Sequence, residues 1–161
     1  MYDVLDVCRY IINYGNSKNY CISNLKLQKI LYFVQAYFLS FTESKQPCFR
    51  EEIEAWDFGP VVPEAYREYK RFGSSTIYLN SRYGISESVQ VWYGSSKTAK
   101  RVEISEEDKE IINKVVDRFA HLAVSYLVSV THAQDPWKNV YYPYRKAIIT
   151  KESIREYFAH E

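Results

Sequence analysis

Apolar residues recur at helical spacing along most of the chain. Residues 3–14 carry one apolar stripe, whereas residues 25–39 are apolar around most of the helix circumference. A single stripe is typical of a surface helix, and an apolar circumference is typical of a buried one. The pattern therefore predicts an amphipathic helix over residues 3–14 and a second helix, capped by Ser23, at the centre of the core. Gly15 is predicted to end the first helix as its C′ residue, followed by a polar loop over residues 16–19.

The segment after the central helix has a different pattern. Apolar and polar residues alternate over residues 52–58, which favours a short β-strand. Pro60 and Pro63 each lack a backbone donor and have a fixed φ, so they predict a stiff elbow rather than a strand. Pro63 also suits the first turn of a third helix over residues 63–72.

The strongest helical periodicity lies in the second half of the chain. Ser105 and Asp108 form the capping-box pattern S-x-x-D, with Asp in place of Glu. Apolar residues then keep helical register from residue 111 to residue 130. This segment is either one long helix or two helices joined by a bend near His121, and periodicity alone allows both.

The last elements are predicted to be short. Asp135 and Pro136 fit the N-cap and the first residue of a further helical turn. Residues 144–150 form a β-prone run, and Thr150 is predicted to cap a last helix over residues 151–158. The whole pattern predicts a mainly α fold, a compact helical domain of about five to seven helices with a minor short β element.

Length and charge fit one globular domain over residues 1–161. The chain carries 21 basic and 20 acidic residues, a net charge of +1, and it lacks the basic excess of a dedicated nucleic-acid binder. A weak nucleic-acid contact through basic residues of the polar stretch 74–104 is the lesser alternative. The N-terminus does not resemble a signal peptide, and residues 25–41 are too polar to span a bilayer, so we predict a cytoplasmic protein without membrane contact. The alternative nucleic-acid contact would use the basic residues Lys97, Lys100 and Arg101.

The residues that could carry chemistry do not form a recognisable site. Cys8 lies on an apolar stripe and is predicted to be in the core, whereas Cys21 and Cys48 fall in predicted loops. No two cysteines form a CxxC pair, so neither a disulfide framework nor a zinc site is predicted. His132 and Asp135 alone are too few ligands for a metal ion, and a cysteine hydrolase remains only as an alternative. We therefore predict a non-enzymatic protein without a cofactor.

Aromatic and rigid residues gather in two segments instead. These are EAWDFGPVVPEAY, residues 54–66, and THAQDPWKNVYYPY, residues 131–144. Their tryptophans either anchor the core or contact a partner, and both interpretations stay open. The 16 tyrosines likewise fit either an interface or an AT-rich gene. The predicted partner-binding residues are Trp56, Pro60, Pro63, Tyr66, Arg67, His132, Trp137, Tyr141, Tyr142 and Tyr144.

These same segments resemble the Panacea domain of SocA-like antitoxins and phage-associated proteins. The matching blocks are residues 25–39, 51–70 and 127–138, with a looser match over residues 148–158. The most specific positions are Trp56, Gly59, Pro60, Val61 and Pro63, together with Thr131, His132, Pro136 and Trp137.

The resemblance implies a helical domain with a minor β element and no cofactor. It also implies an antitoxin that neutralises a cognate toxin protein by direct contact. One branch of the family delivers its toxin to a cellular protease, so a proteolytic adaptor is the first alternative function. A DNA-binding regulator is the second, and the near-zero net charge disfavours it. The oligomeric state is left open.

Overall fold

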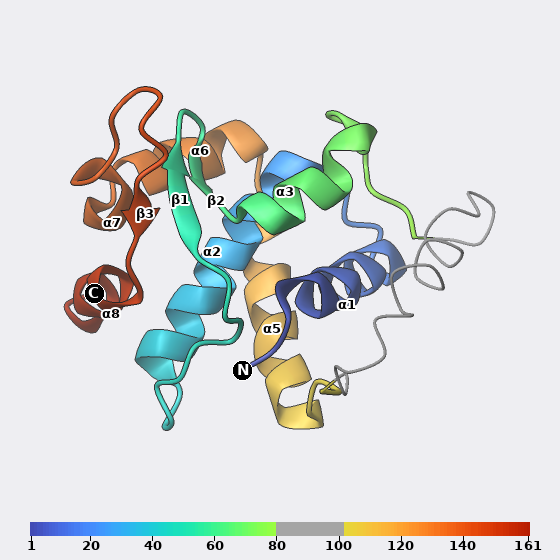
Figure 1. The fold of residues 1–161 in the computed structure, drawn as a ribbon. Helices are drawn as coiled ribbons and strands as arrows, with labels where there is room; N and C mark the ends of the chain where they lie inside the picture. Colours follow the sequence, from blue (N-terminus) through green and yellow to red (C-terminus); the bar gives the residue numbers. More distant parts are fainter. Residues whose placement is uncertain (80–101) are drawn as a thin grey trace, which may run out of the picture.

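The computed structural model describes residues 1–79 and 102–161, and within these residues the fold is mainly helical (Figure 1). The predicted fold class is therefore confirmed. The basic residues of the nucleic-acid alternative, Lys97, Lys100 and Arg101, lie outside the described residues. The described helices are α1 (Val4–Ser17), α2 (Asn24–Phe41), α3 (Pro63–Tyr69), α5 (Glu106–Phe119), α6 (Val124–His132), α7 (Asp135–Lys138) and α8 (Lys151–Ala159), with a 3₁₀ turn, η1 (Lys70–Phe72). The strands are β1 (Ile53–Trp56), β2 (Gly59–Val61) and β3 (Ile148–Ile149).

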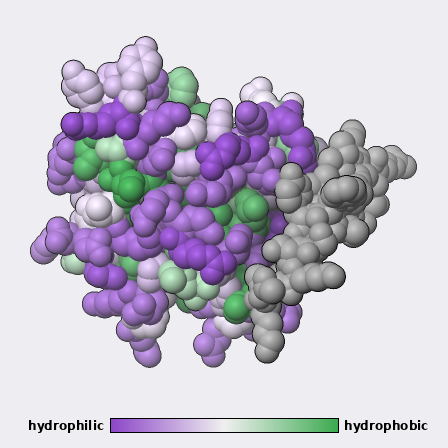
Figure 2. All heavy atoms as spheres, in the orientation of Figure 1, coloured by the Kyte–Doolittle hydropathy of each residue, from purple (hydrophilic) through white to green (hydrophobic). Residues whose placement is uncertain are grey.

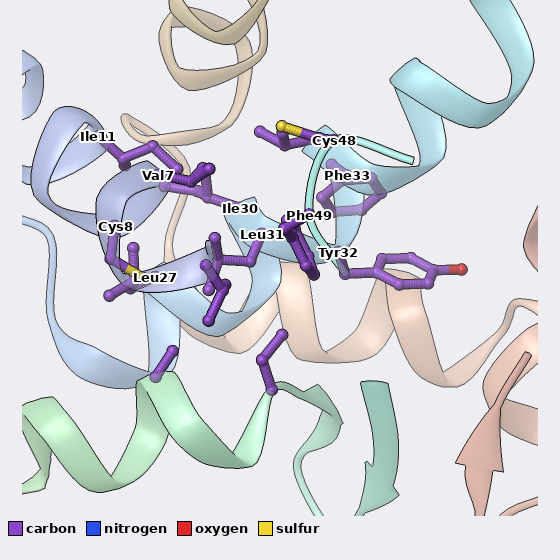
Figure 3. Close-up of a cluster of buried hydrophobic side chains, with 14 of the residues drawn as sticks. Val7, Cys8, Ile11, Leu27, Ile30, Leu31, Tyr32, Phe33, Cys48 and Phe49 are labelled. Atoms are coloured by element: carbon purple, nitrogen blue, oxygen red, sulfur yellow. The ribbon is translucent and has the colours of Figure 1, made fainter. Parts of the chain in front are cut away.

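Helix α2 is the central helix, as its apolar circumference predicts. It contacts α3, α5, α6, α8 and β2, and it runs through the middle of the molecule in Figure 1. The hydroxyl of Ser23 accepts a hydrogen bond from the Lys26 N–H and caps the helix as predicted. Each large apolar side chain of α2 that is fully buried stabilises the fold by about 1.5–3 kcal/mol. Figure 3 shows α2 side chains gathered with those of α1 and of the segment before β1, among them Val7, Cys8, Ile11, Leu27, Ile30, Leu31, Cys48 and Phe49.

Buried polar side chains of α2 attach the non-helical segments to the core. The Gln28 side chain accepts a hydrogen bond from the Val62 N–H at 3.0 Å. Gln35 accepts from the Cys48 N–H at 2.8 Å and donates to the Phe49 carbonyl at 2.9 Å. Because buried backbone groups need hydrogen-bond partners, the side-chain amides of Gln28 and Gln35 take the place of water at the backbone of residues 48, 49 and 62.

The three strands form a small antiparallel sheet in the order β2–β1–β3. The strand predicted over residues 52–58 is confirmed as β1, but the elbow predicted at Pro60 is wrong, because Pro60 lies in β2 and pairs with Ala55. Pro60 is tolerated there because β2 is an edge strand, where a missing N–H removes no ladder hydrogen bond. The Ala55 N–H bonds on its other side, to the Ala147 carbonyl.

Several predicted helix boundaries are confirmed. Ser105 accepts from the Asp108 N–H at 3.2 Å, and Thr150 accepts from the Ser153 N–H at 3.1 Å, so both serve as N-caps. The long periodic segment consists of two helices, α5 and α6, which are separated at residues 120–123.

Two other predicted boundaries are wrong. Helix α1 continues through Gly15 to Ser17, because Gly15 is buried and leaves room for the Ile22 side chain. A Cβ at Gly15 would lie 2.5 Å from Ile22 Cδ1, so close packing explains this glycine. Helix α7 includes Asp135, and its N-cap is Gln134.

The surface is mostly hydrophilic, with separate apolar patches (Figure 2). In the described part of the chain, no helix combines the length and the apolar character that a bilayer crossing requires. The larger exposed apolar side chains include Phe41, Phe58, Tyr126, Tyr142 and Tyr144.

Candidate protein-binding site

The β1–β2 hairpin turns at Asp57 and Phe58. Trp56 pairs with Gly59 across the hairpin, so only two residues form the turn. Gly59 has a φ of 106°, which an L side chain rarely adopts. The tight turn holds Phe58 in solvent with 64% of its surface exposed.

The second aromatic segment packs directly against this hairpin. Trp137 of α7 is stacked between His132 and Tyr141, with ring centroids 4.0 Å and 4.3 Å away. Its indole N–H donates to the Trp56 carbonyl at 2.9 Å. The Tyr141 hydroxyl donates to Asp57 at 2.6 Å, and this hydrogen bond raises the pKa of the Tyr141 phenol. The two segments that the sequence analysis singled out therefore form one cluster.

An open hollow of about 290 Å³ lies on the outer side of this cluster. The Trp56 and Tyr66 rings meet edge to face in its wall, 5.0 Å apart. The Lys146 ammonium lies over the Trp56 ring at 4.8 Å, within the range of a cation–π interaction. We call this site the aromatic hollow; its lining residues are Leu25, Ala55, Trp56, Asp57, Phe58, Val61, Tyr66, Tyr141, Tyr142, Tyr144 and Lys146.

The outer rim of the aromatic hollow is exposed and conformationally strained. Tyr142 is 67% exposed and Tyr144 is 99% exposed. Tyr144 and Lys146 have φ values of 65° and 49°, which are uncommon for residues other than glycine. Such conformations persist where the surrounding structure holds them, often at functional sites, although Asn19 and Lys45 outside the hollow also have positive φ values.

Two of the three cysteines and His132 lie in surroundings that disfavour their charged forms. Burial raises the pKa of the Cys8 and Cys48 thiols, which keeps both in the poorly nucleophilic protonated form. Burial also lowers the pKa of His132, whose Nε2 is buried without a hydrogen-bond partner. Within residues 1–79 and 102–161, no three His, Cys, Asp or Glu side chains come together as metal ligands would.

A buried lysine supports the hairpin from below. Lys29 of α2 is fully buried, and its ammonium donates to the Pro60 carbonyl at 2.9 Å. Burial lowers the pKa of Lys29 to about 7. The hydrogen bond holds β2 against α2, and a neutral amine can also donate it, so the burial that penalises the charged ammonium makes the folded protein favour the neutral form.

We expect Lys29 to make the protein more stable at mildly alkaline pH. Between a folded pKa of about 7 and the higher unfolded value, the unfolded chain binds more protons, so the free energy of unfolding rises with pH. The rise should be about 2–3 kcal/mol up to about pH 9, at about 1.4 kcal/mol per unit. Above that pH, ionisation of Cys8 and Cys48 in the unfolded chain opposes it. Urea unfolding measured across this range tests the prediction.

The variant Lys29→Met should remove most of the rise, whereas Lys26→Met should keep most of it, because burial lowers the pKa of Lys26 too but Lys26 is far less buried. Lys26 makes a matched control because it also donates to a backbone carbonyl, that of Ala120, but is only partly buried. An unchanged pH dependence in Lys29→Met would contradict the assignment.

The comparison with known sequences identifies the family. Residues 27–138 match the family described as "Antitoxin SocA-like, Panacea domain". The chain belongs to this family. A curated relative, Antitoxin SocA of Caulobacter vibrioides (strain NA1000 / CB15N), is 30% identical over 137 residues, which cover 84% of this chain and 68% of the relative. No solved structure matches the chain.

The Panacea match divides the aromatic hollow into two parts. Trp56 and Tyr66 lie inside the matched residues, and so do His132 and Trp137 beneath the hollow. The tyrosine-rich rim over residues 141–146 follows the matched region. A family-matched hairpin and helix thus form the base of the hollow, and a following loop forms its outer rim.

The structure places the ten predicted partner-binding residues in four settings. Five line the aromatic hollow: Trp56, Tyr66, Tyr141, Tyr142 and Tyr144. His132 and Trp137 stack beneath Tyr141, while Pro60 and Pro63 are buried and shape the hairpin and the start of α3. Arg67 is exposed on α3 outside the lining residues.

Sequence reasoning did not select Leu25, Phe58 or Lys146, which also line the hollow. Phe58 stands within the matched hairpin segment and could have been found from its place in the turn. Lys146 and Leu25 join the site only through tertiary packing, and no local pattern marks them.

Proposed function

We propose that this Panacea-domain protein is the antitoxin of a toxin–antitoxin pair, that it neutralises its toxin by direct protein–protein binding without catalysis, and that the aromatic hollow is the contact surface. The family and the antitoxin relative support the toxin as partner. The observation that carries the site is the convergence of two distant aromatic segments on one exposed hollow.

The hollow combines fixed and exposed aromatic groups. Trp56, Tyr66 and Tyr141 are held in place by ring packing and by the hydrogen bond to Asp57. A surface that is already ordered loses little entropy on binding. Phe58, Tyr142 and Tyr144 are exposed and would lose water on contact, as aromatic anchors of binding hot spots do.

Growth of bacteria tests the function. The product of the gene adjacent to this one is expressed alone and together with this protein. Arrest of growth by the neighbour alone, and rescue by this protein, are the expected results. Co-purification of an intact complex would favour sequestration, whereas loss of the neighbour only when a cellular protease is present would favour delivery to that protease. A neighbour that leaves growth unaffected would contradict the toxin–antitoxin assignment.

We expect the double variant Tyr142→Ala/Tyr144→Ala to fold normally and to bind the toxin poorly. Both side chains are exposed, so the free energy of unfolding should change by less than about 0.5 kcal/mol. Loss of two aromatic anchors should weaken binding by about 2 kcal/mol or more, roughly thirtyfold in Kd. Titration calorimetry and urea unfolding on the same sample provide both values.

The matched control is Tyr78→Ala. Tyr78 is 49% exposed and lies outside the aromatic hollow. It should change neither binding nor rescue of growth. A double variant that binds as tightly as the wild type would rule out the rim of the hollow as a contact.

A further inference from the structure

A second groove lies elsewhere on the molecule and shares no residue with the aromatic hollow. Its volume is about 640 Å³, and it follows α2 between α5 on one side and α6 and α8 on the other. We call it the α2 groove; its lining residues are Phe33, Ala36, Tyr37, Phe41, Lys114, Val115, Arg118, Phe119, Leu122, Tyr126, Leu127, Val130, Gln134, Phe158 and Glu161.

The floor of the α2 groove is an aromatic stripe on one face of α2. Phe33, Tyr37 and Phe41 follow one another at four-residue spacing, so they lie above one another on the helix. Phe33 stacks on Phe119 at 4.0 Å and is 6% exposed, whereas Phe41 is 53% exposed. Among the residues that the structure describes, none covers the outer part of this stripe. An apolar helical stripe of this kind normally packs against another element.

One wall of the α2 groove is basic. Lys114 and Arg118 are exposed, one turn apart on α5, and neither forms an ion pair within the described residues. Two like charges at this spacing destabilise an isolated helix slightly. An acidic group placed between them would remove this repulsion. Tyr126 of α6 and Phe158 of α8 line the opposite, mainly apolar side, which also carries Glu161 at its end, so the positive charge of the groove is confined to the α5 wall.

We propose that the α2 groove docks an amphipathic helix of a partner protein, with its apolar face on Phe33, Tyr37 and Phe41 and its acidic flank toward Lys114 and Arg118. Helix-in-groove docking uses apolar anchors at three- and four-residue spacing, which matches the spacing of the stripe on α2. The acidic flank sets the orientation, because charge pairs at the rim of an interface fix register. Since no residue is shared with the aromatic hollow, a helix in the α2 groove would not compete with a toxin for the same side chains.

A synthetic peptide tests the docking without any toxin. The probe is an amphipathic helix of about four turns, with leucines on one face and glutamates along one flank. Its twin carries lysines in place of the glutamates. In fluorescence anisotropy titrations, the wild-type protein should bind the glutamate peptide at least tenfold more tightly than the lysine peptide. The Lys114→Glu/Arg118→Glu variant should reverse this preference, and Phe41→Ala should weaken the binding of both peptides.

The control is Lys18→Glu/Lys70→Glu, which makes the same change in net charge at exposed positions outside the α2 groove. It should retain the preference of the wild type. Failure of the wild type to bind either peptide would overturn the proposal, and so would a preference that does not depend on Lys114 and Arg118. Self-association that Phe41→Ala abolishes would also overturn it, by assigning the α2 groove to a second copy of this chain. A failed peptide titration leaves the growth assay of the antitoxin function unaffected, so the two proposals fail separately.

Discussion

Replacement of Trp137 by alanine should destabilise the protein by about 3–5 kcal/mol, the usual range for a large buried aromatic residue. Only 8% of Trp137 is exposed, and its indole stacks on both His132 and Tyr141. Its N–H also donates to the Trp56 carbonyl. Trp137→Ala therefore leaves a cavity and removes a link between α7 and the β1–β2 hairpin. Chemical unfolding followed by circular dichroism measures the loss.

The variant Trp56→Ala separates folding from binding. Trp56 is half-buried and lines the aromatic hollow, where the Tyr66 ring packs edge to face against its ring and the Lys146 ammonium lies over it. We expect Trp56→Ala to lose less stability than Trp137→Ala. Relative to that loss of stability, it should lose more affinity for the toxin. Trp137→Ala with normal unfolding and strongly reduced binding would instead make Trp137 a direct contact, and normal values for both would contradict either role.

The elements that sequence alone predicted well are those with local signals. The N-caps at Ser23, Ser105 and Thr150 are set by hydrogen bonds to backbone groups three residues away. The helical register of α2 follows directly from its apolar residues. Signals of this range require no knowledge of the rest of the fold.

The failures come from contacts between different elements of the fold, which the pattern within one element does not show. Pro60 is compatible with β2 only because that strand lies at the edge of the sheet, next to Ala55. Gly15 lies inside α1 rather than after it, because the Ile22 side chain occupies the space that a Cβ at this position would need. Lys29 resembles an ordinary polar interruption of an apolar helix, and its burial follows from the position of the Pro60 carbonyl.

The candidate site has the same dependence on distant contacts. Sequence reasoning selected the two aromatic segments from composition and from turn residues, and Trp137 joins them through the Trp56 carbonyl. The hydrogen bond between Asp57 and Tyr141 spans 84 positions of the chain. No local pattern encodes such a pairing. The sequence therefore indicated which tyrosines were candidates, but it did not show that they surround one hollow. Their role as toxin contacts remains a prediction.

Substitution of Gly59 by alanine should destabilise the protein by about 2–6 kcal/mol, the sum of backbone strain and overpacking. The φ of 106° disfavours any Cβ, and a Cβ built there would lie 2.8 Å from Thr131 Oγ1 and 3.0 Å from Lys29 Cε. Thr131 cannot move freely, because its hydroxyl donates to the Leu127 and Val128 carbonyls. The turn that carries Phe58 must shift instead, so toxin binding should weaken as well. Urea unfolding and calorimetry test both effects.

The matched control is Gly73→Ala. Gly73 also has a positive φ, 56°, but no atom lies within 4 Å of the Cβ position. This variant should show backbone strain alone, about 1–3 kcal/mol, and toxin binding should be unchanged. A clearly larger loss of stability at Gly59 than at Gly73 would indicate the added cost of close packing of the hairpin against Lys29 and Thr131. Equal losses of stability would mean that strain explains the whole effect at Gly59 and that this packing does not hold the hairpin in place.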